Sequence, residues 1–170
     1  MGEAPVKAGA GPAGPVHRLI EWWALLGGAV LLGIALLTAW SAATGFLFGK
    51  PLPGDFELTQ ILVAVAVFSF LPYCQLTNAN VTADLFTAGA GPRTVAALGV
   101  LAALLALGVS VVLTWRTWAG MLDFRQFVET TAILKIPIWA AYVPAVASLA
   151  LLVLACVIVL VKNARALMRG

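Results

Sequence analysis

The chain has 170 residues, of which 62% are hydrophobic and only 10% are charged. Ordinary soluble domains carry about 25% charged residues, so this composition excludes a soluble globular protein. The net charge of +3 comes from Lys and Arg residues that flank apolar segments without forming a basic cluster, which argues against a nucleic-acid partner. We therefore expect an integral membrane protein whose main surroundings are a lipid bilayer.

The N-terminal part of the chain predicts a tail followed by a first membrane span. Residues 1–17 are rich in Gly, Ala and Pro and lack apolar periodicity, which predicts a disordered tail. The apolar segment at 22–43 is longer than the roughly 7–15 residues of a signal-peptide core, so we predict an uncleaved transmembrane helix. Gly27 and Gly28 within it leave room for a second helix to approach closely.

The second apolar segment, at 56–75, follows a Gly- and Pro-containing loop at 44–55. Five of its residues recur along one face at helical spacing, with polar groups at both ends: Glu57, Gln60, Ala64, Phe68 and Gln75. Such a face is predicted to contact protein rather than lipid. The alternative interpretation is that Glu57 and Gln75 are hydrated helix ends, because both lie near the predicted membrane surfaces.

The rest of the chain predicts two more spans. Residues 77–90 have the pattern of a short amphipathic helix lying in the membrane interface. The third span is predicted at 94–114, and the fourth at 137–161, where Pro137 suits a first helical turn. Between them, residues 120–135 alternate apolar and charged side chains and are predicted to form a loop with a short surface helix.

These segments together predict the fold class and the domains. We expect an all-α integral membrane protein with four transmembrane helices plus a short interfacial amphipathic helix. Residues 18–165 would form the four-helix membrane domain, and residues 166–170 a basic C-terminal tail.

The flanking charges and the tryptophans predict the orientation. Six Lys and Arg residues fall on the side of both termini and four on the other side, which favours cytoplasmic termini in a bacterial inner membrane. The tryptophans would form a belt at the two membrane surfaces, with two at the first surface and four at the second: Trp22, Trp23, then Trp40, Trp115, Trp118 and Trp139.

The sequence shows no pattern of catalytic or metal-ligating residues. His17 is the single histidine and lies outside the spans, while Cys74 and Cys156 lack the CxxC spacing of a redox pair. Glu21 and Glu57 are too close to the span ends for an exporter that carries protons through its centre. We therefore predict no catalytic residue, metal or cofactor, and expect a protein that holds a partner in the membrane.

Four short motifs resemble a known family. They are residues 54–58 (GDFEL), 71–75 (LPYCQ), 80–85 (NVTADL) and 130–139 (TTAILKIPIW), the last followed by Tyr142. In this order and spacing they resemble the small membrane subunit, DctQ-like, of tripartite ATP-independent periplasmic (TRAP) transporters. Asn80 stands where that family usually has His, and Ala83 where it usually has Val.

The resemblance implies a transport system with three components. A periplasmic binding protein would capture an organic acid, and a large permease subunit would move it together with sodium. The small subunit would support the large one without binding substrate, and its charged loop residues would help to dock the binding protein: Lys50, Asp123, Arg125 and Glu129. The transported substrate is not encoded in this chain, because specificity belongs to the other components.

Two functions of other classes remain as alternatives. The chain could be a stand-alone four-helix membrane enzyme or assembly factor, or a small self-assembling exporter. Neither alternative needs a large permease subunit or a binding protein, and this distinguishes them from the transporter subunit.

Overall fold

The structure is a computed structural model that describes residues 14–77 and 92–169. Four α-helices account for most of these residues: α1 (Pro15–Phe48), α2 (Asp55–Leu76), α4 (Pro92–Gln126) and α5 (Ile138–Arg169). All four contain a segment that is long and apolar enough to cross a membrane. The described residues contain no β-strand, only an isolated antiparallel bridge between Thr130 and Pro137. The protein is therefore an all-α, multi-pass membrane protein, and the predicted fold class is confirmed.

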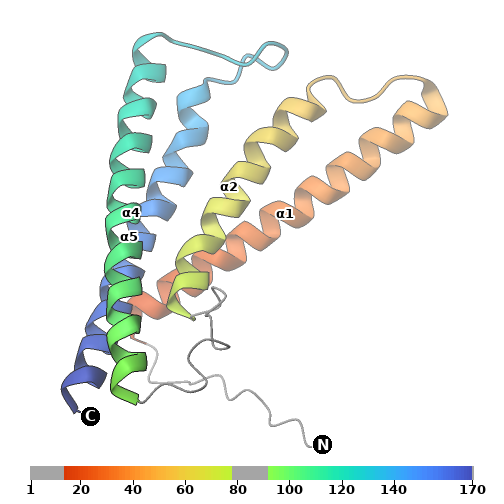
Figure 1. Ribbon diagram of the computed structural model, residues 1–170. Coiled ribbons are helices and arrows are strands. Elements are labelled where there is room, and N and C mark those ends of the chain that lie inside the picture. The colour runs from red at the N-terminus through yellow and green to blue at the C-terminus, as the bar shows by residue number, and fades with distance from the viewer. Residues whose placement is uncertain (1–13, 78–91, 170) are drawn as a thin grey trace, which may run out of the picture.

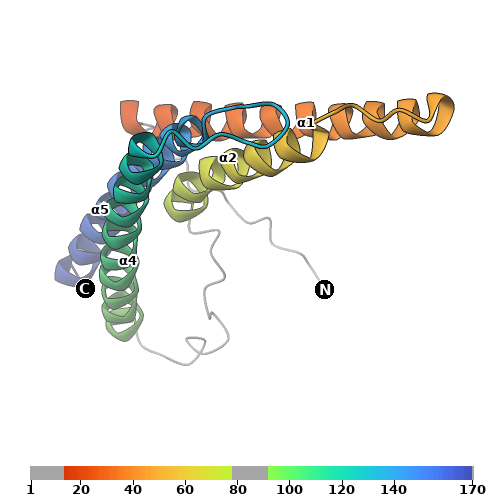
Figure 2. The ribbon, with the colours of Figure 1, turned by 90° about the horizontal axis from the view of Figure 1, so that it is seen from above.

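The helices form two hairpins that diverge from a common end (Figure 1). α2 contacts both α1 and α5, and α4 contacts α5, so α2 and α5 join the two hairpins. Seen from above, α1 runs away from α4 and α5 (Figure 2). The α1–α2 and α4–α5 connections lie at the open end of this arrangement, opposite the beginning of α1 and the end of α5 (Figure 1).

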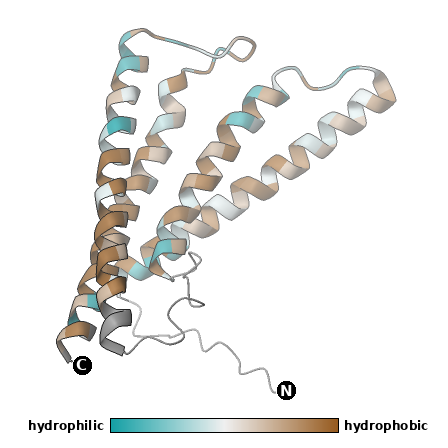
Figure 3. Cartoon of the chain, in the orientation of Figure 1, coloured by the Kyte–Doolittle hydropathy of each residue, from teal (hydrophilic) through white to brown (hydrophobic). Residues whose placement is uncertain are grey.

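Hydrophobic residues follow the middle of every helix, and hydrophilic residues occur mainly toward the helix ends and connections (Figure 3). Little of this apolar surface is buried within the chain itself. In the most apolar 18 residues, 33% are buried in α5 but only 11% in α4. α5 is thus the central helix, and most of the remaining apolar surface is available to lipid or to another protein.

The helix ends follow local backbone signals that extend beyond the apolar segments. α1 has 34 residues and is therefore about 51 Å long, well over the roughly 30 Å hydrocarbon core, so it crosses obliquely or projects from the membrane. It ends where Gly49 adopts a left-handed conformation with φ 67° and donates its N–H to the Gly45 carbonyl. Gly54, with φ 81°, precedes α2 in the same way.

The helices extend beyond the predicted spans, because hydropathy marks the length of the hydrocarbon core and not the end of backbone hydrogen bonding. α1 begins at Pro15, inside the predicted disordered tail, and residues 44–48 extend it beyond the predicted span. Residues 120–126, predicted as loop, belong to α4. Residues 166–169, predicted as a tail, continue α5. The predicted interfacial helix at 77–90, apart from Thr77, and the tail residues 1–13 lie outside the described residues.

α1 and α2 pack closely through small residues. A Cβ atom added at Gly27 would lie 2.7 Å from the Ser69 Cβ and 3.4 Å from the Ala66 carbonyl oxygen. Ala66 and Ser69 are themselves buried. Because lipid gives membrane helices no hydrophobic reason to associate, close contact of this kind depends on the absence of bulky side chains. The close approach predicted at Gly27 is therefore present in the structure.

Candidate partner-binding site

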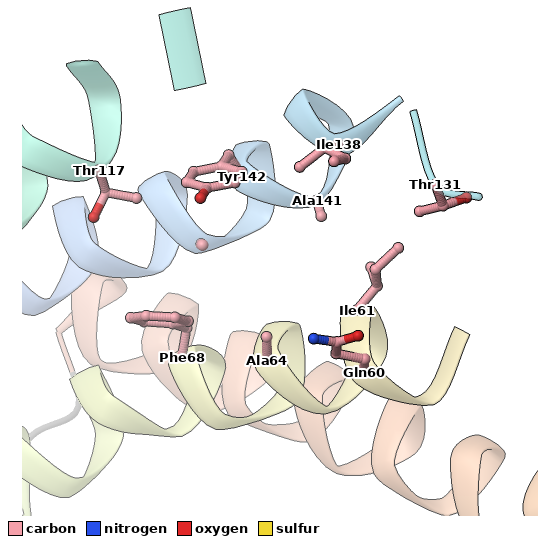
Figure 4. A pocket seen from close by; sticks show the side chains of 10 residues that line it. Gln60, Ile61, Ala64, Phe68, Thr117, Thr131, Ile138, Ala141 and Tyr142 are labelled. Atoms are coloured by element: carbon pink, nitrogen blue, oxygen red, sulfur yellow. The ribbon is translucent and has the colours of Figure 1, made fainter. Parts of the chain in front are cut away.

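A cavity of about 510 Å³ lies between α2 and α5, and Thr131 of the α4–α5 connection lines part of it. α2 supplies one wall and α5 the facing wall, while α4 and the α4–α5 connection each add a threonine (Figure 4). The lining is mainly apolar with a few polar groups: Gln60, Ile61, Ala64, Phe68, Thr117, Thr131, Ile138, Ala141, Tyr142 and Ala145.

The α2 wall contains three of the five residues predicted to contact a partner. Gln60, Ala64 and Phe68 follow one another at four-residue intervals and point into the cavity (Figure 4). Gln60 and Ala64 are exposed, whereas Phe68 is half-buried. The periodicity thus identified a single face of α2, and that face looks toward α5 of the same chain across an accessible space. Contact between this face and another protein stays a prediction.

The other two predicted residues lie elsewhere. Glu57, at the beginning of α2, accepts hydrogen bonds from the backbone N–H groups of Ile133 at 2.8 Å and Leu134 at 3.0 Å. Its carboxylate therefore ties α2 to the α4–α5 connection. Gln75 is half-buried near the opposite end of α2 and is not part of the cavity lining.

The α4–α5 connection has a defined shape that allows this contact. Thr131 donates its N–H to the Ile136 carbonyl at 2.9 Å, and its side-chain oxygen accepts from the Ile136 N–H at 3.1 Å. These bonds close a tight turn that directs the N–H groups of Ile133 and Leu134 at Glu57. Val128 and Lys135 adopt left-handed φ values of 50° and 55°, which are unfavourable for residues with a Cβ.

Gly54 is required where this connection meets α2. A Cβ atom there would lie 2.5 Å from the Leu134 side chain, and the positive φ of Gly54 already favours glycine. The 54–58 motif and the 130–139 motif therefore meet in space, about 76 positions apart in sequence. Neither motif by itself indicated this contact, because nothing in the sequence pairs a carboxylate with backbone donors so distant.

The charged residues predicted to dock a binding protein lie in or beside the two connections at the open end. All four side chains are exposed to solvent: Lys50, Asp123, Arg125 and Glu129. Arg125 also lies over the ring of Trp139, with 6.0 Å between its Cζ atom and the ring centroid. The role of these residues in docking stays a prediction.

Besides Trp139, which lies under Arg125, a second residue of the predicted tryptophan belt makes a described contact. Trp23 donates its Nε1–H to the Ser148 Oγ at 2.8 Å, which joins α1 to α5. Its neighbour Trp22 is 66% exposed. The other four, Trp40, Trp115, Trp118 and Trp139, are exposed as well, and their membrane depth stays a prediction. Sequence reasoning missed the link to Ser148, which lies 125 positions away.

Comparison with known families gives the family of this chain. Residues 34–166 match the family described as "Tripartite ATP-independent periplasmic transporters, DctQ component". The chain belongs to this DctQ family. The match extends from within α1 to within α5 and includes the cavity lining and all four motifs. The predicted resemblance is thereby confirmed. The motif containing Asn80 lies outside the residues that the structure describes.

Searches among curated proteins and among solved structures returned no match to this DctQ protein. Among its described residues, no group of three or more His, Cys, Asp or Glu side chains could hold a metal ion. Cys74 and Cys156 are not joined in a disulfide. The cavity between α2 and α5 has apolar walls, and a few polar side chains in its lining can form hydrogen bonds with a bound molecule.

Proposed function

We propose that this DctQ protein is the small, non-catalytic subunit that supports the large permease subunit of an organic-acid TRAP transporter. The observation that carries this proposal is the cavity between α2 and α5, where Gln60 and Ala64 remain exposed although they belong to a four-helix unit. A partner helix can place side chains there, against apolar walls that carry only a few polar groups.

The long apolar helices support the same proposal. α4 buries little of its own surface, and α1 is longer than the hydrocarbon core is thick. An exposed apolar surface of this size is suited to contact with a second membrane protein. The spans themselves contain no charged residue at their centres, where a subunit that bound sodium or an organic anion would be expected to have polar ligands.

The open end of the hairpins would then face the periplasm, with both termini in the cytoplasm of a bacterial cell. Six Lys and Arg residues on the terminal side against four on the other side support this orientation. Lys50, Asp123, Arg125 and Glu129 would lie where a periplasmic binding protein approaches. Exposed charges at such a place accelerate association and select the correct partner more than they add affinity.

Reconstitution into liposomes tests the proposal. Vesicles would contain this chain and the large subunit, with the binding protein and an organic acid outside and an inward sodium gradient. We expect uptake only when all three proteins are present. Uptake by the purified chain alone would contradict the proposal and favour a self-assembling exporter. Full uptake without this chain would show that the large subunit does not require its support.

A further inference from the structure

A second groove, of about 420 Å³, lies between α1 and α2 near the terminal end of the molecule. It is separate from the α2–α5 cavity and shares no residue with it. Six residues line it: Glu21, Ala24, Leu25 and Gly28 of α1, with Phe70 and Tyr73 of α2.

The polarity of this groove changes along its length. Glu21 and Tyr73 lie toward the helix ends, whereas Gly28 and Phe70 lie deeper, since the two helices run in opposite directions. Glu21 and Gly28 are seven residues apart, which corresponds to about 10 Å along a helix. A Cβ at Gly28 would be 3.9 Å from the Phe70 ring, so the missing side chain opens the deep part. The polar-to-apolar order is that of an amphiphile with its headgroup at the membrane surface.

The charges at the polar end define the headgroup that would fit. The Glu21 carboxylate lies 3.2 Å from His17 Nδ1 through its Oε1 atom. A carboxylate has two oxygens with about four acceptor positions, so this contact leaves room for another donor. Arg18 does not line the groove, but it is exposed three residues before Glu21, a spacing that puts a cation and an anion on the same side of the helix. A headgroup that combines an ammonium and a phosphate complements this pair of opposite charges.

We propose that this groove binds a phospholipid with a primary-amine headgroup, phosphatidylethanolamine. Its ammonium group donates hydrogen bonds to Glu21, its phosphate lies near Arg18, and one acyl chain covers Leu25, Gly28 and Phe70. Phosphatidylcholine has the same charges but its quaternary ammonium has no N–H to donate. The groove should therefore distinguish the two lipids by hydrogen bonding, not by charge.

Native mass spectrometry of the full chain in mild detergent tests this inference. The chain is mixed with phosphatidylethanolamine and phosphatidylcholine of identical acyl chains, in equal amounts. We expect the ethanolamine lipid to be retained about fivefold more, the factor expected for one partly exposed charge-assisted hydrogen bond. Glu21→Leu should abolish this preference, because leucine is of similar size and has no acceptor for an ammonium N–H. Gly28→Leu should reduce retention of both lipids by filling the groove.

Gly33→Leu is the matched control, because a Cβ at Gly33 of the same helix meets nothing within 4 Å. It should leave both the retention and the preference unchanged. Equal retention of the two lipids by the unaltered chain would overturn the inference, as would a preference that survives Glu21→Leu. Loss of the co-expressed large subunit with Gly28→Leu, at unchanged lipid retention, would show instead that the groove contacts protein. Neither result depends on transport, so the proposed function is tested separately.

Discussion

The two sides of α2 contact their neighbours in different ways. Toward α1, Ala66 and Ser69 are buried, and the helices approach so closely that Gly27 has no space for a Cβ. Toward α5, Gln60 and Ala64 are exposed beside a cavity of about 510 Å³. Both contacts belong to one helix of 22 residues.

The difference shows which contact the chain completes by itself. In a membrane, helices associate through close packing and hydrogen bonds, because lipid and leucine are equally apolar. The α1–α2 contact has this packing, and Ser41 adds a hydrogen bond to Asp55 near the connection. The α2–α5 contact is equally extensive but encloses a cavity, and Glu57 joins the beginning of α2 to the α4–α5 connection. The first contact is therefore structural, and the second leaves room for a partner.

Gly27→Leu should have the largest effect on stability, because it places a bulky side chain in the tight contact between α1 and α2. Overpacking at a site with no free space typically costs about 1–3 kcal/mol of the free energy of unfolding. Gly33→Leu gains the same helix propensity without meeting any neighbour, so it is the matched control. The measurement is unfolding of the purified chain in detergent. Equal stability of the two variants would show that the α1–α2 contact is not closely packed.

Ala64→Trp should affect assembly and not folding, because it fills the open side. We expect the amount of large subunit that co-purifies to fall about tenfold, which corresponds to roughly 1.4 kcal/mol. Val63→Trp is the control, since Val63 is exposed on α2 and does not line the cavity. The melting temperature of the isolated chain should stay close to that of the unaltered chain in both variants. Undiminished co-purification with Ala64→Trp would show that the partner binds elsewhere.

Trp23→Phe tests the hydrogen bond that joins α1 to α5 near the terminal end of the molecule. Removing the indole N–H deletes its hydrogen bond to Ser148 and should lower the free energy of unfolding by about 1 kcal/mol. The Ser148 hydroxyl would still donate to the Pro144 carbonyl, so no buried donor is left unpaired. Trp22→Phe, at an exposed position, should change stability by less than about 0.5 kcal/mol. A reversed order of the two variants would contradict the proposed bridge.

Glu57→Ala should have the smallest effect on overall stability and a clear local one. Without the carboxylate, the N–H groups of Ile133 and Leu134 lose their acceptor and should exchange hydrogen faster. Glu129→Ala removes a carboxylate from the same connection, and it should leave the exchange of those two amides unchanged. Hydrogen-exchange mass spectrometry of the peptide containing residues 131–136 measures both. Unchanged exchange in Glu57→Ala would mean that the turn is held by its own hydrogen bonds.

Part of the candidate site could be predicted from the sequence, and the reason is helical geometry. Gln60, Ala64 and Phe68 share a face because residues four apart on a helix always do. Which neighbour that face looks toward could not be predicted, since periodicity within α2 contains no information about α5. The same limit explains why the Thr117 and Tyr142 contributions to the cavity were missed.

The sequence by itself determined that this protein is a membrane-spanning bundle of the DctQ family. Long apolar segments, few charges and ordered motifs are local properties, and a bilayer permits little besides helices for such segments. Only the tertiary structure decided that α2 is closed against α1 and open toward α5, and that Glu57 holds a connection 76 positions away. Those features depend on how whole helices pack, and that packing is the sum of many weak contacts between distant residues, none of which is visible in a local pattern.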